Sequence, residues 1–288
     1  MTGRTPASIR PVVSLTVLRL TRVAPRMIRM VAGGPGLARW KPTGFTDAYV
    51  RIVFPIPGVR YPAGFDMRRI RAEMPRADWP RTRTYTVRSF DSAASELAID
   101  FVDHGGTGLA PPWLATLEPG DPVLLHDLRG GYRPGAEADW HLLAGDAAAL
   151  PAIAVTLEAM APGLRATVIV EVNDAADEQP LHTAADVDLR WVYRARGGSL
   201  VEAVRSLTFG PGVVQAFVHG EGGAIQDLRR HLLGERGVAR DLLSISGYWR
   251  RGLDDEQWRQ LKASAAAVDA AAALQPVVGD VDRRRLRA

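Results

Sequence analysis

The pattern of apolar residues changes once along this chain, at a link rich in glycine, proline and acidic residues, Tyr132–Asp139. Before the link, short segments often alternate apolar with polar residues, and turn-forming runs such as Gly33–Gly36 and Pro55–Gly58 separate them. Alternation with a period of two predicts strands, and about six strands in roughly 125 residues fit a small closed antiparallel barrel. The predicted strands are Val12–Arg19, Met27–Ala32, Ala48–Phe54, Thr84–Ser89, Glu96–Val102 and Pro122–His126.

After the link, predicted strands alternate with predicted helices, which is typical of a parallel sheet with helices on both faces. The strands are Trp140–Ala144, Ala166–Val172, Val187–Tyr193, Val213–Val218 and Leu242–Ser246, and the helices are Leu150–Met160, Ser199–Ser206, Ala224–Leu233 and Asp254–Ala273. The sequence therefore predicts a β-barrel plus α/β fold. A six-stranded antiparallel barrel spans residues 8–134, and a Rossmann-like domain ending in a C-terminal helix spans residues 139–274. The polar residues 275–288 are expected to form a loose tail.

Composition excludes several classes of protein. The chain has 288 residues and no cysteine, which excludes disulfides, thiolate metal sites and cysteine nucleophiles. Its start has no apolar signal region, and its most apolar stretch, His141–Ala161, is interrupted by Asp146, Pro151 and Glu158, so we expect a cytoplasmic protein without a membrane segment. The histidines lack metal-ligand spacing, and no serine lies in a nucleophile motif, so we expect neither a metal site nor a catalytic side chain.

The net charge is +4, and nearly all the basic residues are arginines. They are spread along the chain rather than gathered in one basic block, so we expect no nucleic-acid partner. Arginine does suit phosphates and other anionic ligands, which leaves an anionic small molecule as a partner. The sequence leaves the oligomeric state open.

The first candidate site is the run Arg83–Arg88 on a predicted barrel strand. A flavin needs a flat wall beside its ring, hydroxyl or amide donors near its polar edge, and cations for its phosphates. Because alternate side chains of a strand share a face, Arg83 and Tyr85 point one way, while Thr86 and Arg88 point the other. By spacing alone, a solvated strand with arginine on its outer face is the favoured alternative.

A second candidate is the glycine-rich loop Gly105–Trp113, which follows a strand and leads into a short helix. Exposed backbone N–H groups there suit a pyrophosphate, although a flexible hairpin turn fits the same residues. Three further candidates lie at ends of strands in the second half: Gly145–Ala152, Val218–Gly223 and Ser246–Gly252. Small residues at such positions let a nucleotide approach the backbone. Tyr248, Trp249 and the neighbouring arginines either line a site or pack the last strand against the barrel.

In combination these segments resemble the siderophore-interacting proteins, a family of FAD-dependent ferric-siderophore reductases in the ferredoxin-reductase superfamily. The resemblance runs from about Thr21 to Leu261. It rests on Pro25–Arg29, Asp47–Arg51, Arg83–Arg88, Asp100–Gly105, Gly145–Asp146, Ala149–Ala152, Gly220–Glu221 and Ser246–Arg250, which occur in the family's order.

The resemblance implies roles for individual residues. Tyr85 would lie beside the isoalloxazine and Thr86 near its reactive edge, with arginine at the FAD phosphates. The other residues implied at FAD are Arg83, Val87, Arg88, His104, Gly105, Gly108, Ala110 and Trp113. Those implied at the nicotinamide nucleotide, NAD(P)H, are Gly145, Asp146, Gly220 and Glu221. Tyr248 and Trp249 are further cofactor-binding candidates. Basic residues at Arg51, Arg129 and Arg250 would hold an anionic ferric siderophore in a cleft between the domains.

Two departures from the family pattern bear on the reaction. Pro111 replaces the serine of the usual Gly-x-Ala-Ser loop, and Ala147 and Ala148 replace the Glu and Thr of Asp-Glu-Thr-Ala-Leu-Pro. The sequence therefore supports NAD(P)H-dependent ferric-siderophore reduction as the first hypothesis. The second is a reused fold that has lost the nicotinamide or flavin step and binds an organic ligand or catalyses a non-redox biosynthetic step, and the third is a flavin-bearing partner reduced by another carrier.

Overall fold

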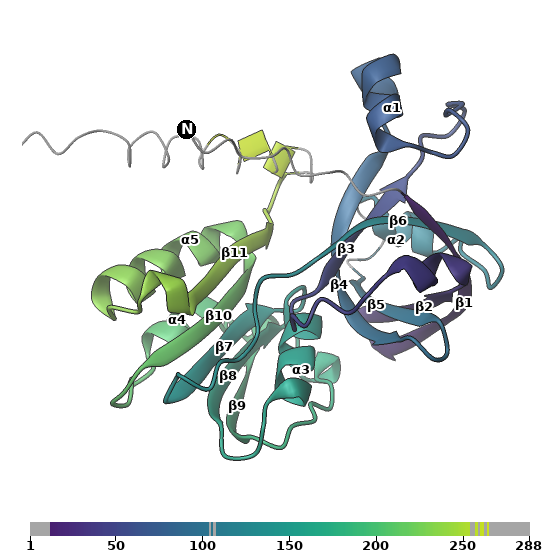
Figure 1. Ribbon diagram of the computed structural model, residues 1–288. Helices are drawn as coiled ribbons and strands as arrows, with labels where there is room; N and C mark the ends of the chain where they lie inside the picture. The colour runs from purple at the N-terminus through teal and green to yellow at the C-terminus, as the bar shows by residue number, and fades with distance from the viewer. Residues whose placement is uncertain are drawn as a thin grey trace, which may run out of the picture.

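In the computed structural model, two bodies lie side by side, a β-barrel and an open α/β sheet (Figure 1). The structure describes residues 12–103, 105, 108–253, 257–258, 260–261 and 264. Residues 8–11 of the predicted barrel domain, His104, much of the predicted helix Asp254–Ala273 and the tail 275–288 lie outside the described residues.

The barrel contains six strands, each paired antiparallel with its neighbours. They are β1 (Val13–Ala24), β2 (Met27–Gly33), β3 (Tyr49–Phe54), β4 (Arg81–Asp91), β5 (Glu96–Val102) and β6 (Pro122–Arg129), in the closed order β1-β2-β5-β4-β3-β6. Alternate residues of β1, beginning with Val13, Leu15 and Val17, fill the interior. The predicted six-stranded antiparallel barrel is therefore confirmed.

Short helices lie in the segments that connect the barrel strands. The 3-10 helices η1 (Pro35–Arg39) and η2 (Arg76–Asp78) lie in connecting segments, as do α1 (Met67–Glu73) and α2 (Ala110–Leu114). The sequence analysis did not predict α1, which buries only Met67 and Ile70 against Val53 on the outside of the barrel.

The second body has five parallel strands in the order β11-β10-β7-β8-β9. They are β7 (Trp140–Asp146), β8 (Arg165–Val172), β9 (Asp186–Tyr193), β10 (Val214–Glu221) and β11 (Leu243–Trp249). Their connections include α3 (Leu150–Ala159), α4 (Leu200–Arg205) and α5 (Gly222–Arg230), with the short turns η3 (Ala175–Asp177), η4 (Arg194–Arg196), η5 (His231–Glu235) and η6 (Arg240–Leu242). The parallel sheet predicted after the link is confirmed.

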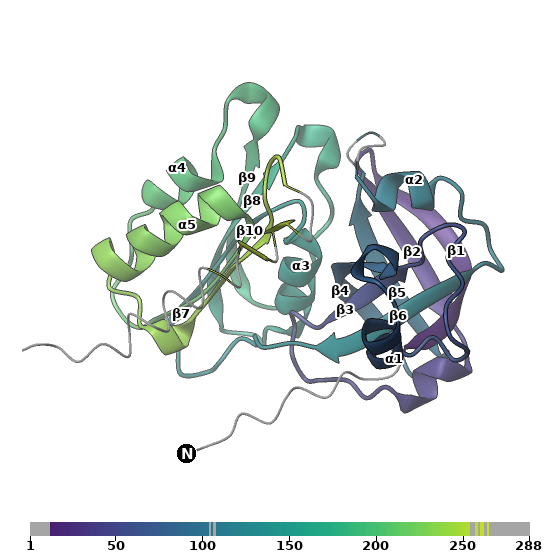
Figure 2. The ribbon, with the colours of Figure 1, turned by 90° about the horizontal axis from the view of Figure 1, so that it is seen from above.

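Helices cover both faces of this sheet. Helix α3 packs on one face through Leu150, Ile153 and Leu157, while α4 and α5 pack on the other through residues such as Val204 and Leu228. Helix α3 faces the barrel, and α4 and α5 lie on the far side of the sheet (Figure 2). Within the described part of the chain, no helix is both long and apolar enough to cross a membrane.

Candidate functional site

The strand β4 carries the predicted flavin segment, and its side chains alternate between faces. Arg83 pairs with Ile52 of β3 and Tyr85 with Val50, so both lie on the interior side of the barrel wall, whereas Thr86 pairs with Tyr49 on the outer side. The half-buried Tyr85 ring lies against Phe101, with ring centroids 4.4 Å apart. This gives β4 a flat aromatic surface with a half-buried guanidinium two residues away.

Trp113 of α2 extends the same aromatic cluster. Its ring centroid lies 5.0 Å from that of Phe54 and 6.1 Å from that of Phe101. Ala110 is buried against the barrel core, so the start of α2 is fixed next to the glycine-rich loop. Gly105 and Gly108 both have positive φ angles, of 75° and 92°, and no atom lies within 4 Å of where a Cβ would be. The loop backbone therefore has space beside it for a ligand.

Thr86 connects the barrel to the α/β sheet. It is buried, and its side chain lies beside the hydroxyl of Tyr248 on β11. Burial raises the pKa of Tyr248, so this phenol stays protonated. The predicted flavin strand and the last strand of the parallel sheet therefore meet at two residues that the sequence analysis had assigned to cofactor binding.

Arg88 forms ion pairs with two carboxylates. Its Nη1 and Nη2 donate to the two oxygens of Glu158 on α3, at 3.0 and 2.5 Å, and its Nε lies 4.0 Å from Asp100 of β5. Asp100 in turn accepts two hydrogen bonds from Arg29 of β2, at 2.6 and 2.7 Å. In this arrangement Arg88 bridges the two domains, and a phosphate would have to replace Glu158 to bind it.

Asp146 ends β7 inside the protein. It is only 5% exposed, and its carboxylate accepts hydrogen bonds from Trp249 Nε1 at 2.7 Å and from the backbone of Ala148 at 2.9 Å. Burial raises the pKa of Asp146 to about 6, because these hydrogen bonds only partly compensate for the loss of water. A Cβ on Gly220 of β10 would lie 2.8 Å from this carboxyl group, so glycine is needed there.

Glu221 caps helix α5 rather than facing an open site. Its carboxylate accepts from the backbone N–H groups of Gly223 at 2.7 Å and Ala224 at 3.0 Å. It also accepts from the backbone of Arg251, and Arg250 lies 3.8 Å away. Although burial opposes ionisation, these hydrogen bonds and the charge of Arg250 lower the pKa of Glu221. The positive end of α5 is therefore already matched by an internal carboxylate.

The three arginines predicted to bind the substrate lie on two bodies. Arg129 pairs with Tyr49, and Arg51 lies two residues from Tyr49 on β3, so Arg51 and Arg129 share the outer face of neighbouring barrel strands. Arg250 follows β11 in the α/β body, beside Glu221. Neither of the two interdomain cavities found among the described residues is lined by these three side chains.

Residues 138–252 match the family model described as "Siderophore-interacting protein", and residues 16–132 match "Siderophore-interacting FAD-binding domain". The chain belongs to the siderophore-interacting protein family. The family's ferric vibriobactin reductase ViuB of Vibrio cholerae is 30% identical over 85% of this chain and 92% of its own. The NADPH-dependent ferric-chelate reductase of Escherichia coli is 28% identical over 77% of this chain and 87% of its own. The crystal structure of SipS from Aeromonas hydrophila has a TM-score of 0.75 and 30% identity, covering 89% of this chain and 98% of that one.

As in other siderophore-interacting proteins, the barrel is an FAD-binding domain. Two of its features would suit that cofactor: the half-buried Tyr85 ring with Arg83 two residues away, and the glycine loop, which has open space beside Gly105. Pro111, the family departure in this loop, occupies the first turn of α2, where a helix requires no N–H from that residue. The substitution therefore leaves the helix intact but removes one backbone N–H from the start of α2.

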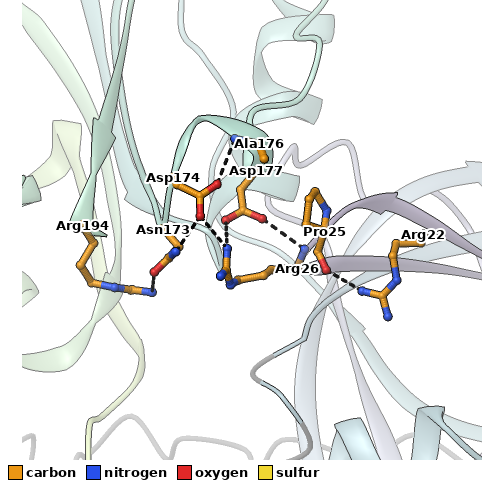
Figure 3. A network of polar contacts seen from close by, with 8 residues as sticks. All are labelled: Arg22, Pro25, Arg26, Asn173, Asp174, Ala176, Asp177 and Arg194. Carbon is orange, nitrogen blue, oxygen red and sulfur yellow. Dashed lines mark hydrogen bonds and ion pairs between the residues drawn. The ribbon is translucent and has the colours of Figure 1, made fainter. Parts of the chain in front are cut away.

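Sequence reasoning missed a polar connection between the domains. Arg26, in the turn between β1 and β2, donates from Nη1 to Asp174 at 3.0 Å and to Asp177 at 2.8 Å, and its backbone N–H also donates to Asp177 (Figure 3). Arg26 and Asp177 line an interdomain crevice together with Asp146, Asn173 and Trp249. Arg26 belongs to a segment that carried the family resemblance, but nothing in the spacing of the sequence identified its acidic partners.

The crevice also contains the second family departure. Ala147 and Ala148 line it beside Asp146 on one side, and Met27 and Val102 of the barrel line it on the other. Both alanines are half-buried and bring no polar side-chain atom into the crevice. Recognition of a nucleotide here would therefore depend on the backbone and on neighbouring side chains.

Proposed function

We propose that this protein is an NAD(P)H-dependent ferric-siderophore reductase that releases ferrous iron. Membership of a siderophore-interacting, FAD-binding family supports a flavin oxidoreductase acting in siderophore metabolism. The observation that carries the proposal is the proximity of Thr86 and Tyr248, because it brings the barrel strand that we assign to FAD next to the sheet edge where nucleotides bind in α/β folds.

The proposed reaction balances without a protein nucleophile. One NAD(P)H gives up a hydride, equivalent to two electrons and a proton, and two ferric siderophores each accept one electron. The products are NAD(P)⁺, two ferrous ions, two siderophores and one proton. Bound FAD supplies the change from a two-electron donor to single-electron chemistry. Ferrous iron binds hard oxygen ligands more weakly than ferric iron, so reduction favours release.

The chain's own residues bind and orient in this proposal. Tyr85 and Arg83 would hold the flavin ring and phosphates, and the loop at Gly105 and Gly108 would border the pyrophosphate. The crevice beside Asp146 would receive the nicotinamide nucleotide. Because NAD(P)H is a metabolite of the cytoplasm, the proposal places the reaction there.

Arg51, Arg129 and Arg250 would attract an anionic ferric siderophore. Charge attraction at partly exposed groups is screened over about 8 Å at physiological ionic strength. Binding of a ferric catecholate should therefore weaken as salt is raised, and replacing all three arginines with glutamine should flatten that dependence. An affinity independent of salt would instead indicate recognition through apolar contacts.

The alternative is a reused fold that retains the barrel but no longer uses the nucleotide. Ala147 and Ala148 favour it, because they line the crevice without the two polar side chains that the family resemblance implies there. The test is the visible spectrum of the FAD-loaded protein under anaerobic NADH or NADPH, with and without a ferric catecholate, and a ferrous-iron chelator to detect release. Bleaching of the flavin followed by ferrous iron supports the proposal.

The variant Ala147→Glu/Ala148→Thr sharpens this test. Each lost hydrogen bond to a charged group typically costs about 1.5–3 kcal/mol, so restoring both should strengthen nucleotide binding by roughly two to four powers of ten. Faster flavin reduction at low NAD(P)H concentration is the expected result. If parent and restored variant both leave the flavin oxidised, the nicotinamide route is wrong and the reused-fold alternative replaces it.

A further inference from the structure

Basic residues occur along the whole chain, but their surplus over acidic residues is concentrated in one segment. Residues 55–81, the basic arm, run from the end of β3 to the first residue of β4 and include α1. They contain six arginines and three acidic residues, a difference of three. The whole chain has 36 basic and 32 acidic residues, a difference of four, so the remainder is nearly balanced. All six arginines of the basic arm are exposed: Arg60, Arg68, Arg69, Arg71, Arg76 and Arg81.

Helix α1 is anchored so that its charged side faces outward. Met67 and Ile70 are buried against Val53 on the outside of the barrel, which occupies the apolar side of this short helix. Figure 1 shows α1 projecting beyond the barrel strands. The arginines of α1 therefore lie on a projecting surface that the fold itself leaves open to solvent.

Two of the three acidic residues of the basic arm interact within α1. Asp66 is the N-cap and accepts from the backbone N–H of Arg68 at 2.8 Å. Glu73 accepts from Nε of Arg69 at 2.9 Å. These carboxylates stabilise the helix, and the arm still presents more positive than negative charge to a partner.

The loop that precedes α1 is mostly uncharged. Between positions 55 and 65 the one charged residue is Arg60, and the others are proline, glycine, alanine and larger apolar or aromatic residues. The half-buried rings of Tyr61 and Phe65 lie 4.8 Å apart, and the Tyr61 hydroxyl accepts from the backbone of Ile56 at 3.0 Å. The loop is therefore held in a fixed shape beside α1. Apolar residues next to exposed arginines are typical of segments that rest on a membrane surface.

The basic arm suits an extended anionic partner better than a small anion. It projects from the barrel, and neither interdomain cavity described above is lined by any of its residues (Figure 1). An acidic protein or a nucleic acid would contact the arginines but would leave the apolar loop without a role. A lipid surface would use both features, since arginines bind headgroup phosphates while apolar groups enter the layer beneath them.

We propose that the basic arm docks this protein on a membrane surface that carries anionic phospholipid. The arginines of α1 contact the lipid phosphates, and the loop at residues 55–65 enters the headgroup layer. The inference is independent of the proposed reaction, because no residue of the arm belongs to the flavin, nucleotide or siderophore sites described above. Failure of one therefore leaves the other standing.

The test is co-sedimentation of the FAD-loaded protein with vesicles of phosphatidylcholine, with and without phosphatidylglycerol. The parent should bind only the vesicles that contain phosphatidylglycerol, and binding should weaken as salt is raised, because salt screens exposed charges. Arg68→Gln/Arg69→Gln/Arg71→Gln should weaken partitioning roughly a hundredfold, since each arginine near an anionic surface contributes about fivefold. Flavin content and circular dichroism of this variant should match the parent.

The matched control removes the same charge from the α/β body. Arg196→Gln/Arg230→Gln/Arg240→Gln replaces three exposed arginines. Like the α1 set, this set contains one arginine over an aromatic ring and one in an ion pair within a helix. The control variant should bind the vesicles as tightly as the parent, because its arginines lie outside the basic arm.

A second readout locates the contact. The chain has no cysteine, so a single introduced thiol can carry a polarity-sensitive fluorophore. Ala63 lies in the loop and Ala195 in the α/β body, and both are exposed. On vesicles with phosphatidylglycerol, the label on Ala63→Cys should brighten and that on Ala195→Cys should not.

The inference is wrong if the parent does not sediment with these vesicles, if the control variant loses as much binding as the α1 variant, or if the label on Ala63→Cys does not respond. Binding of the parent to polyglutamate or to a DNA duplex, but not to the vesicles, would also overturn it. That result would assign the arm to an acidic protein or a nucleic acid.

Discussion

Arg88 of the barrel and Glu158 of α3 form a two-point ion pair across the domain boundary, with nitrogen–oxygen distances of 2.5 and 3.0 Å. Paired charges are worth more where water is partly excluded, and the Arg88 side chain is only 15% exposed. Buried threonines add a second connection on the same helix, since Thr156 and Thr46 share a hydrogen bond of 2.8 Å. Helix α3 is therefore tied to the barrel by two contacts within its last turn.

Glu158→Gln should reduce the free energy of unfolding by about 1 kcal/mol, the upper range for an incompletely buried pair. Urea denaturation of parent, Glu158→Gln, Arg88→Gln and the double variant gives the coupling energy. The matched control is Glu73→Gln on α1, where the pair with Arg69 is about half exposed on both sides and should contribute less. A coupling energy near zero for Arg88 and Glu158 would contradict the assignment of this pair as an interdomain connection.

Asp146 should make stability depend on pH. Its folded pKa of about 6 lies above its ordinary value of 3.8, so between these values the folded state binds a proton more tightly than the unfolded chain. This contribution is fully present below about pH 4 and is lost as the pH rises through 6. Asp146→Asn cannot ionise, so its stability relative to the parent should rise by up to about 3 kcal/mol from pH 4 to pH 7. Equal differences in unfolding free energy at the two pH values would show that the carboxyl is not perturbed.

Gly220→Ala should disturb the same site sterically. Its Cβ would lie 2.8 Å from the Asp146 carboxyl, and the residue has a φ of 152° that other residues rarely adopt. We expect a loss of about 1–3 kcal/mol in the free energy of unfolding. Gly234→Ala, where no atom lies within 4 Å of the new Cβ, is the control and should be close to neutral. Thermal or urea unfolding of both variants separates local crowding from a general cost of replacing glycine.

Arg83→Ala/Tyr85→Ala should abolish retention of FAD, because it removes the half-buried guanidinium and the aromatic face of β4. The barrel should stay folded, since neither residue belongs to the fully buried core of the barrel. Absorbance of the purified protein reports the bound flavin, and circular dichroism reports the fold. A double variant that retains FAD as tightly as the parent would remove this strand from the flavin site.

The fold could be predicted from the sequence because periodicity is a local property. The predicted ends of strands and helices were wrong where irregular pairing or a capping side chain overrides the local sequence pattern. Strand β1 extends to Ala24 rather than Arg19, because irregular pairing between Val17 and Arg19 breaks the alternation. Helix α5 begins at Gly222 rather than Ala224, because the Glu221 side chain caps it and compensates for two glycines.

The candidate site was predictable only in part. Their positions at the ends of predicted strands identified Asp146 and Trp249 as candidate site residues, each on its own. The family resemblance placed Thr86 and Tyr248 near a cofactor. Their contacts with one another join residues 103 or more positions apart, and no spacing rule reaches that far. The same holds for Arg26, whose acidic partners lie 148 and 151 residues later.

Closure of the barrel has a consequence for the behaviour of the protein at high concentration. Among the described strands, all six of the barrel have hydrogen-bonded neighbours on both sides, so none offers a template to another molecule. The open sheet has two outer strands, β9 and β11, and the exposed positions of β9 include Asp186, Asp188 and Arg190. Adding a strand there would bring charged side chains together and strip them of water. Resistance to strand pairing at the β9 edge thus depends on three charged residues of that strand.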